Sequence, residues 1–269
     1  MIGAILGDIV GAPYEFDNCK SKSFSLFDPH TLYTDDTVMT VAVAVADALL
    51  EWNGKSREGF KEILIDAIHK WGKRFPQAGY GGRFLSWVLG DSRLPYGSYG
   101  NGSAMRVSPV AWYANTLEDT LALAHASAEV THDHPEGVKG AVAVAGAIFL
   151  ARTGESKESI RAFLSQYYEL DFTLDDIRED YAFDETCQGS VPEALTAFLE
   201  GESFEDVIRT AVSIGGDSDT IAAIAGSIAE AYYGVPEDLT QTALSYLEFP
   251  LLTVVKDFTQ RFVEPKQRR

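Results

Sequence analysis

Apolar residues recur at helical spacing along most of this chain, and this periodicity constrains the fold more than any other feature. Two stretches, residues 140–147 and 222–227, consist almost entirely of alanine, valine, isoleucine and glycine. Small residues allow helix axes to approach closely, and apolar character on every face implies burial. No convincing set of alternating strands is present. We therefore predict an all-α protein with these two helices in the middle of a multi-helix bundle.

The apolar spacing predicts helices over Val38 to Trp52, Phe60 to Trp71, Leu117 to Val130, Val138 to Arg152, Ile160 to Tyr168, Val191 to Glu200, Phe204 to Ser213 and Ile221 to Tyr233. Residues 41–46 alternate valine with alanine and resemble a strand in that respect. The alanines, and the continuation of the segment through Asp47 and Leu50, instead favour a buried helix.

The 269 residues contain no linker and no break in composition, so we predict one domain over residues 1–265 and a basic, solvated tail over 266–269. Apolar residues make up 46%, and no uninterrupted apolar run approaches the length that crosses a bilayer. The first residues lack the basic leader of a signal peptide, and Cys19 and Cys187 lack metal-ligand spacing. We expect a soluble protein of the reducing cytoplasm.

The chain is strongly acidic, with 40 acidic and 22 basic residues and a net charge of −18. This balance argues against broad binding of nucleic acid or of an anionic membrane, because both need a positive surface. A small phosphorylated ligand is still compatible with it, since backbone N–H groups and bound metal ions can hold phosphates.

Two short acidic strings, residues 34–37 (Thr-Asp-Asp-Thr) and 215–220 (Gly-Gly-Asp-Ser-Asp-Thr), each run into an apolar helical segment. Taken singly, the first string has a simpler explanation as a helix cap. The second contains more than a cap needs, because its glycines permit unusual backbone angles. Its Asp-X-Asp spacing places Asp217 and Asp219 on one side of an extended approach to the helix.

Carboxylate and hydroxyl oxygens are the ligands that hard cations such as Mg²⁺ and Mn²⁺ prefer. A helix N-terminus repels a cation on its axis but keeps nearby carboxylates ionised. Four carboxylates would over-supply a single divalent ion with negative charge, whereas two ions roughly balance them. We therefore predict a site for two divalent cations where the acidic strings meet.

Three further segments are candidates for ligand contact. The Gly100-Asn101-Gly102-Ser103 loop precedes an apolar segment, and the N–H groups of Gly102, Ser103 and Ala104 could face a diphosphate, although a capped Gly-Asn turn explains it equally well. His132 could donate to a ligand or fix its turn with Asp133, and its surroundings are poor in zinc ligands.

Glu15 ends a segment with glycine at positions 3, 7 and 11, a spacing that makes a thin helix face for close packing. Asp8 belongs to the same segment, near Gly11. Glu15 is either a satisfied core group, which the pattern slightly favours, or a poised acid or base.

Taken together, Gly7 to Phe16, residues 34–37, 100–106, 131–135 and 215–220 resemble the ADP-ribosylglycohydrolase family in order and spacing along nearly the whole chain. The two acidic strings are the specific part of this match, and the other segments support it. The resemblance implies a compact, single-domain orthogonal helix bundle with a dinuclear Mg²⁺ or Mn²⁺ centre. The implied activity is hydrolysis of the glycosidic bond between ADP-ribose and an acceptor, a modified protein side chain or a small conjugate.

The resemblance also implies residue roles, carried over position by position. Glu15 and Asp36 are the implied acid–base groups. The implied substrate-binding residues are Gly100, Asn101, Gly102, Ser103 and His132. The implied metal ligands are Thr34, Asp35, Asp36, Asp217, Asp219 and Thr220.

One departure from the family concerns the acceptor. In the branch that acts on arginine-linked ADP-ribose, a loop resembles Arg-Pro-X-Asp, and its aspartate is implicated in catalysis. The corresponding stretch here is 75–80 (Phe-Pro-Gln-Ala-Gly-Tyr), which has no acid. Arginine specificity is therefore in doubt. Two alternative functions stay open: a dinuclear-metal hydrolase of a nucleotide or phosphate ester, and a non-catalytic ADP-ribose-binding protein.

Overall fold

The predicted all-α class is confirmed by the computed structural model, which describes residues 1–28, 31–41, 44–52, 54 and 56–267. The only extended pairing among these residues is an isolated bridge between Gly100 and Thr186. The α-helices are α1 (Ile2–Gly11), α2 (Ala44–Glu51), α3 (Arg57–Arg74), α4 (Gly82–Leu89), α5 (Gly102–Met105), α6 (Ser108–Tyr113), α7 (Leu117–Glu129), α8 (Pro135–Arg152), α9 (Lys157–Leu164), α10 (Leu174–Ile177), α11 (Cys187–Glu200), α12 (Phe204–Val212), α13 (Ser218–Tyr233), α14 (Glu237–Ser245), α15 (Phe249–Phe258) and α16 (Glu264–Gln267). A 3₁₀ turn, η1 (Ala12–Tyr14), and two π-helical segments, η2 (Asp36–Val41) and η3 (Thr259–Val263), complete the set.

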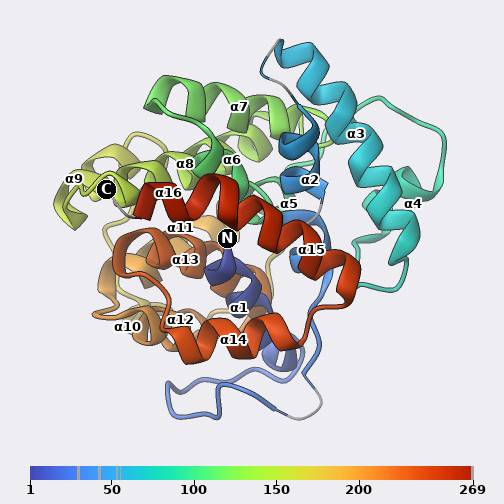
Figure 1. The fold of residues 1–269 in the computed structure, drawn as a ribbon. Coiled ribbons are helices and arrows are strands. Elements are labelled where there is room, and N and C mark those ends of the chain that lie inside the picture. Colours follow the sequence, from blue (N-terminus) through green and yellow to red (C-terminus); the bar gives the residue numbers. More distant parts are fainter. Residues whose placement is uncertain (29–30, 42–43, 53, 55, 268–269) are drawn as a thin grey trace.

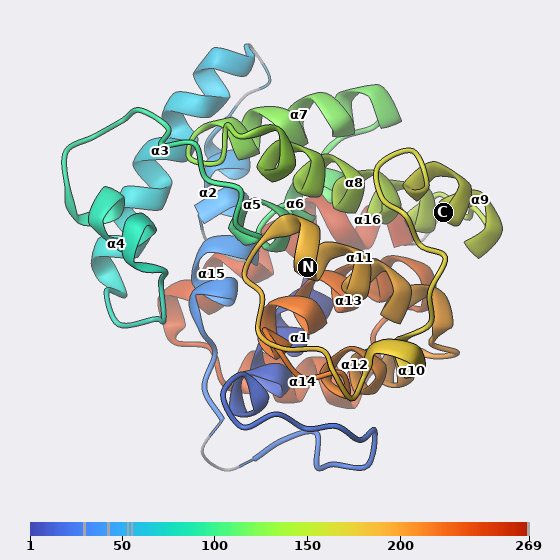
Figure 2. The ribbon, with the colours of Figure 1, turned by 180° about the vertical axis from the view of Figure 1, so that it is seen from behind.

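The helices α1 and α13 form the centre of the bundle, with α7 and α8 on one side and α12 and α14 on the other (Figures 1 and 2). Every residue of α1 is buried, as is every residue of α13 from Ser218 to Glu230. Glycine makes this packing possible, because a Cβ on Gly7 would overlap with the Ala222 carbonyl and one on Gly11 with that of Ser218. The glycine spacing therefore predicted a real contact face.

Serine and threonine side chains begin many of the peripheral helices. Each accepts a hydrogen bond from the backbone N–H three residues later, which satisfies one of the free donors of a first helical turn. The capping residues of this kind are Ser56, Thr116, Ser156, Thr173, Thr186 and Ser203.

The predicted helix over Val38 to Trp52 is divided in the structure. It comprises the π-helical η2 and then α2, and residues 42–43 of the strand-like alternation lie outside the described residues. The periodicity missed the short helices α4, α6, α14 and α15. In α4 only Trp87 and Val88 are buried, so its apolar stripe was too short to stand out.

The C-terminal segment packs against the domain through Lys266. Its Nζ donates to the carbonyls of Trp112, Tyr113 and Ala114 at the end of α6, so this residue of the predicted tail is not simply solvated. Cations are favourable at such helix ends, where carbonyls lack partners. Residues 268–269 of the tail lie outside the described residues. None of the described helices is both long and apolar enough to cross a membrane.

Candidate metal centre and ligand cleft

The two acidic strings meet at one cleft of about 430 Å³. The first string precedes and begins η2, and the second precedes and begins α13, so close packing of η2, α1 and α13 brings them together. The lining residues that were predicted from the sequence are Glu15, Thr34, Asp35, Asp36, Gly100, Asn101, Gly102, His132, Asp217, Asp219 and Thr220.

Direct contacts join the two strings. The hydroxyl of Thr220 donates to Oδ2 of Asp36 at 3.0 Å, and the hydroxyl of Thr34 lies 3.2 Å from Oδ2 of Asp219. The other oxygen of Asp36, Oδ1, is buried without a hydrogen-bond partner among the described residues. A buried carboxylate oxygen left in this way is costly, and a cation would satisfy it.

Asp8, which was not selected as a site residue from the sequence, holds the first acidic string in place through hydrogen bonds. Its carboxylate is completely buried and accepts the N–H of Thr34 at 3.0 Å and that of Thr37 at 2.9 Å. The hydroxyls of both threonines also bond to it. Asp8 therefore sets the backbone of the string whose side chains face the cleft.

The second string is shaped by its glycines. Gly215 and Gly216 both adopt positive φ, +71° and +73°, as their selection from the sequence implied. We predicted from the sequence that Asp217 and Asp219 both lie in an extended segment before the helix, and this is wrong for Asp219. Only Asp217 precedes α13, whereas Asp219 lies inside its first turn and accepts the N–H of Thr220 at 2.9 Å. The helix α13 begins at Ser218, between the two aspartates, and both carboxylates still line the same cleft.

The buried carboxylates strongly perturb one another. Burial and the charge of Asp219 raise the pKa of Asp8 to about 7 and that of Glu15 to about 8. The same two causes raise the pKa values of Asp35, Asp36 and Asp217 well above the usual range. So many buried acids in one place are unfavourable without compensating positive charge.

This donor set fits hard divalent cations. Glu15, Asp217 and Asp219 each have a carboxylate oxygen within 4.8 Å of the others. Asp35 faces the cleft opposite Gly79, where a Cβ would lie 3.4 Å from its Oδ1. All of these ligand atoms are oxygens, the type that Mg²⁺ and Mn²⁺ prefer.

The predicted phosphate-binding loop has a different internal arrangement from the one expected. The Asn101 amide donates to Oδ2 of Asp217 at 2.6 Å, so it holds a candidate metal ligand. Ser103 is fully buried and its hydroxyl donates to the Gly137 carbonyl at 2.6 Å. The N–H of Ala104 is also committed, to the carbonyl of Asn101 at 2.8 Å, so the expectation that it faces a ligand is wrong.

His132 is buried at the edge of this loop, next to Gly102. Arg106 Nη2 donates to the Thr131 hydroxyl at 2.8 Å, and that hydroxyl lies 2.7 Å from His132 Nδ1. Arg106 can only donate, so among the described residues Nδ1 is the one hydrogen-bond partner of this hydroxyl that can accept its proton. We assign the imidazole proton to Nε2 on this ground, because that arrangement leaves no hydroxyl proton without a partner. Burial and the charges of Arg106 and Arg83 hold the pKa of His132 well below its usual range. A neutral imidazole thus offers one N–H donor beside Gly102.

Several lining residues had no signal in the sequence analysis. They come from the segment before the Gly-Asn-Gly loop, from the start of α4 and from the loop before α11: Arg83, Phe84, Tyr96, Phe183 and Glu185. Single aromatic or charged residues in loops carry no periodicity, so only the tertiary structure reveals that they share a cleft. Asp8 did carry a signal, since a carboxylate inside an otherwise apolar, glycine-rich helix needs buried partners.

Comparisons with known proteins agree with this architecture. A family model described as ADP-ribosylglycohydrolase matches residues 1–268, which confirms the family inferred from the sequence. ADP-ribosylhydrolase ARH3 of Homo sapiens is 30% identical over 94% of this chain and 90% of that protein. ADP-ribosylarginine hydrolase Tri1 of Pseudomonas putida is 25% identical over 87% of this chain and 70% of that protein. A solved chain described as an ADP-ribosylglycohydrolase-related protein complex has the same fold, with a TM-score of 0.69, 24% identity and 96% of both chains covered.

Proposed function

Because the chain belongs to the ADP-ribosylglycohydrolase family, we propose that it is a metal-dependent hydrolase of the glycosidic bond between ADP-ribose and an acceptor. The acceptor is a modified protein side chain or a small-molecule conjugate. The observation that carries the proposal is a single cleft lined both by oxygen donors of the two acidic strings and by the Gly100–Gly102 loop with His132.

The proposed metal ligands are Thr34, Asp35, Asp36, Asp217, Asp219 and Thr220, and they hold two divalent cations, Mg²⁺ or Mn²⁺. Such ions supply charge stabilisation, orientation of sugar hydroxyls and a lowered pKa of bound water. The support is the mutual proximity of Asp217, Asp219 and Glu15, together with the unsatisfied buried oxygen of Asp36.

The proposed acid–base group is Glu15, with Asp36 as the second candidate. Cleavage at the anomeric carbon of ribose develops positive charge on the ring, and the departing acceptor needs a proton. Glu15 is only partly buried and lies beside Asp217 and Asp219, so it can exchange protons with solvent while facing the site. Asp36 is buried, and one of its oxygens is already held by Thr220.

The proposed ADP-ribose end of the cleft is lined by Gly100, Asn101, Gly102 and His132. Glycine lets a diphosphate approach the backbone closely, and the Nε2–H of His132 is a neutral donor next to it. Ser103 was also expected to bind substrate, but it is not among the lining residues and its side chain bonds to Gly137, so in this proposal it holds the loop in place. Asn101 acts mainly through Asp217, which its amide holds.

The acceptor is the least constrained part of the proposal. The stretch 75–80 has no acid, and the neighbouring cleft wall consists of Gly79, Gly81, Gly82 and Arg83. The carboxylate beside this wall, that of Asp35 opposite Gly79, is a proposed metal ligand, so the stretch offers no further acid to pair with a positively charged arginine acceptor. We therefore expect arginine-linked ADP-ribose to be a poorer substrate than linkages through neutral oxygen acceptors.

A panel of linkage-defined ADP-ribose conjugates, assayed with Mg²⁺ and with Mn²⁺, tests the proposal. We expect intact ADP-ribose as the product, abolished by a chelator and by Asp217→Ala. Release of AMP or inorganic phosphate instead would indicate a phosphate-ester hydrolase. Tight binding of ADP-ribose without turnover of any conjugate would indicate a binding protein.

A further inference from the structure

Residues 15–25, here called the strap, leave η1 beside the cleft and run along the outside of the turn at residues 214–218 and of α12. We propose that Asn18 and Lys20 of the strap are positioning residues that hold this turn. They thereby couple the placement of Glu15 to the binding of divalent cations at Asp217 and Asp219. This proposal rests on the proposed metal centre, and it names two residues outside that centre that hold its second acidic string in place.

The polar contacts of the turn with the strap, and with Tyr14 just before it, occur in antiparallel order. The hydroxyl of Ser218 lies 3.3 Å from the carbonyl of Tyr14. The N–H of Gly216 donates to Oδ1 of Asn18. The Nζ of Lys20 donates to the carbonyl of Ile214. Side chains of the strap thus supply hydrogen-bond partners to the backbone of the turn, as the backbone of a neighbouring strand would do in a sheet.

The turn needs these partners because it is buried. All residues from 214 to 218 are buried, and a buried backbone N–H or C=O without a partner is unfavourable. The fit around the turn is close on both sides. A Cβ on Gly215 would overlap with Oδ1 of Asn18, and one on Gly216 would overlap with the ring of Tyr181. The turn therefore has little freedom to find other partners.

Lys20 joins three parts of the site. Besides the Ile214 carbonyl, its Nζ donates to the carbonyl of Tyr181 at 2.7 Å. Residue 181 begins the loop that carries Phe183 and Glu185 into the cleft lining. One ammonium group thus connects the strap, the turn of the metal site and the loop that carries Phe183 and Glu185.

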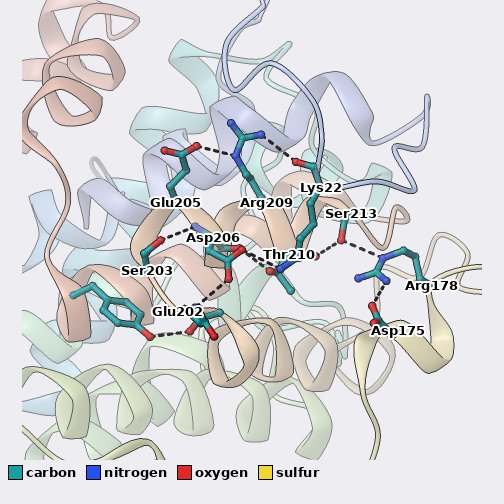
Figure 3. Close-up of polar contacts among 12 residues, drawn as sticks. Lys22, Asp175, Arg178, Glu202, Ser203, Glu205, Asp206, Arg209, Thr210 and Ser213 are labelled. Atoms are coloured by element: carbon teal, nitrogen blue, oxygen red, sulfur yellow. Dashed lines mark hydrogen bonds and ion pairs between the residues drawn. The ribbon is translucent and has the colours of Figure 1, made fainter.

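The far end of the strap is held separately, on α12. Lys22 Nζ lies 3.0 Å from Oδ1 of Asp206, and Arg209 donates to the carbonyls of Lys22 at 3.1 Å and Phe24 at 2.7 Å. Figure 3 shows the contacts of Lys22 with Asp206 and Arg209, and the pairing of Arg209 with Glu205. Lys22 makes no recorded contact with residues 214–218 among the described residues, so it is a matched control for Lys20.

The short chain distances make the coupling direct. Asn18 is three residues from Glu15, and its partner Gly216 immediately precedes Asp217. Glu15, Asp217 and Asp219 already bring carboxylate oxygens within 4.8 Å of one another. If the strap stabilises the geometry that binds cations, bound cations must stabilise the strap by the same factor.

Calorimetric titration with Mn²⁺ tests the first half of this coupling in the full-length protein. We expect Asn18→Ala and Lys20→Met each to raise the Kd roughly tenfold, the effect of losing one buried hydrogen bond. Asn18→Asp retains the acceptor for Gly216 and should bind at least as tightly as the wild type. Lys22→Met, the same substitution two residues further along, should change the Kd less than about twofold, as is usual for an exposed ion pair.

Hydrogen exchange of peptides from residues 14–22 tests the second half. Mn²⁺ should slow exchange in the wild type and in Lys22→Met, and much less in Asn18→Ala and Lys20→Met. Equal Mn²⁺ affinity in wild type, Asn18→Ala and Lys20→Met would overturn the inference while leaving the metal centre intact. Failure of the wild type to bind Mn²⁺ at all would overturn both. If Asn18→Ala does not fold, the contrast between Lys20→Met and Lys22→Met decides the question.

Discussion

Asp8 shows how one residue outside the acidic strings controls the site. Its carboxylate accepts hydrogen bonds from both the backbone and the side chains of Thr34 and Thr37. An ionised carboxylate has two acceptor oxygens, so it can serve all of these donors at once. The residue sits inside a helix that is otherwise apolar, and its partners come from a segment more than 25 positions later.

We predict that Asp8→Asn weakens divalent cation binding at least tenfold. The amide presents N–H groups to donors that need an acceptor, and the substitution also removes one negative charge from the cluster. Both effects lower cation affinity, although the loss of charge repulsion favours folding. Calorimetric titration with Mn²⁺ measures the change. Asp66→Asn, whose carboxylate is exposed and pairs with Arg93, should bind normally. Unchanged affinity in Asp8→Asn would contradict the role assigned to Asp8.

At the scale of elements, the contact between α1 and α13 places the two halves of the site. The helix α1 carries Asp8 and leads to Glu15, whereas α13 begins with Asp219 and Thr220 in its first turn. Glycine at positions 3, 7 and 11 lets the backbones approach so closely that any Cβ there would overlap with α13. The separation of these two helices therefore sets the width of the metal site.

Gly7→Ala tests this packing. Alanine favours an isolated helix over glycine by about 1 kcal/mol, but the overlap with Ala222 should cost about 3 kcal/mol or more. We expect a net loss of stability, measured as the urea midpoint. Gly82→Ala, in α4, meets nothing within 4 Å and should be neutral or slightly stabilising. A Gly7→Ala protein as stable as the wild type would show that α1 can move away without cost.

Glu193 in α11 should make stability depend on pH. Burial and then the charge of Asp184 raise the pKa of Glu193 to about 7 in the folded state, above its ordinary value of 4.5. The folded chain therefore binds this proton more tightly than the unfolded chain, and stability falls as pH rises from about 4.5 to about 7. Glu193→Gln cannot ionise, so its stability relative to the wild type should increase across that range. Urea midpoints at pH 5, 6, 7 and 8 measure it, and parallel curves would refute it.

At the scale of the whole molecule, the net charge of −18 and the buried acidic site act in the same direction. Both make the folded state electrostatically costly, and both are relieved by cations. Surface charge responds to any salt, whereas the cleft responds only to ions that its oxygen donors can bind. The two contributions can therefore be separated.

At a hundredfold excess over Kd, Mn²⁺ or Mg²⁺ should raise the Tm of the wild type by about 5–10 °C for each occupied site, because one bound ion contributes about 2.7 kcal/mol. NaCl at the same ionic strength gives the contribution of screening alone. Asp217→Ala should retain the NaCl effect and lose most of the divalent effect. Equal divalent shifts in wild type and Asp217→Ala would mean that the ions act only on the surface.

The sequence alone was sufficient to predict the all-α class, most of the long helices and the two acidic strings as the candidate metal site. Helical periodicity and helix-starting residues are local properties, so they can be read from short windows such as 138–152 and 215–220. The family resemblance rested on the same short motifs in order. These signals do not depend on knowing which helices touch.

The tertiary structure alone decided how those motifs are held. It showed that Asp8 supports the first string, that Asn101 holds Asp217, and that Asn18 and Lys20 contact the turn before α13. Each of these is a contact between residues far apart in the chain, in places where neither partner carries a periodic pattern. Their proximity follows from the packing of α1, η2, α5 and α13 against one another, which only the folded chain establishes.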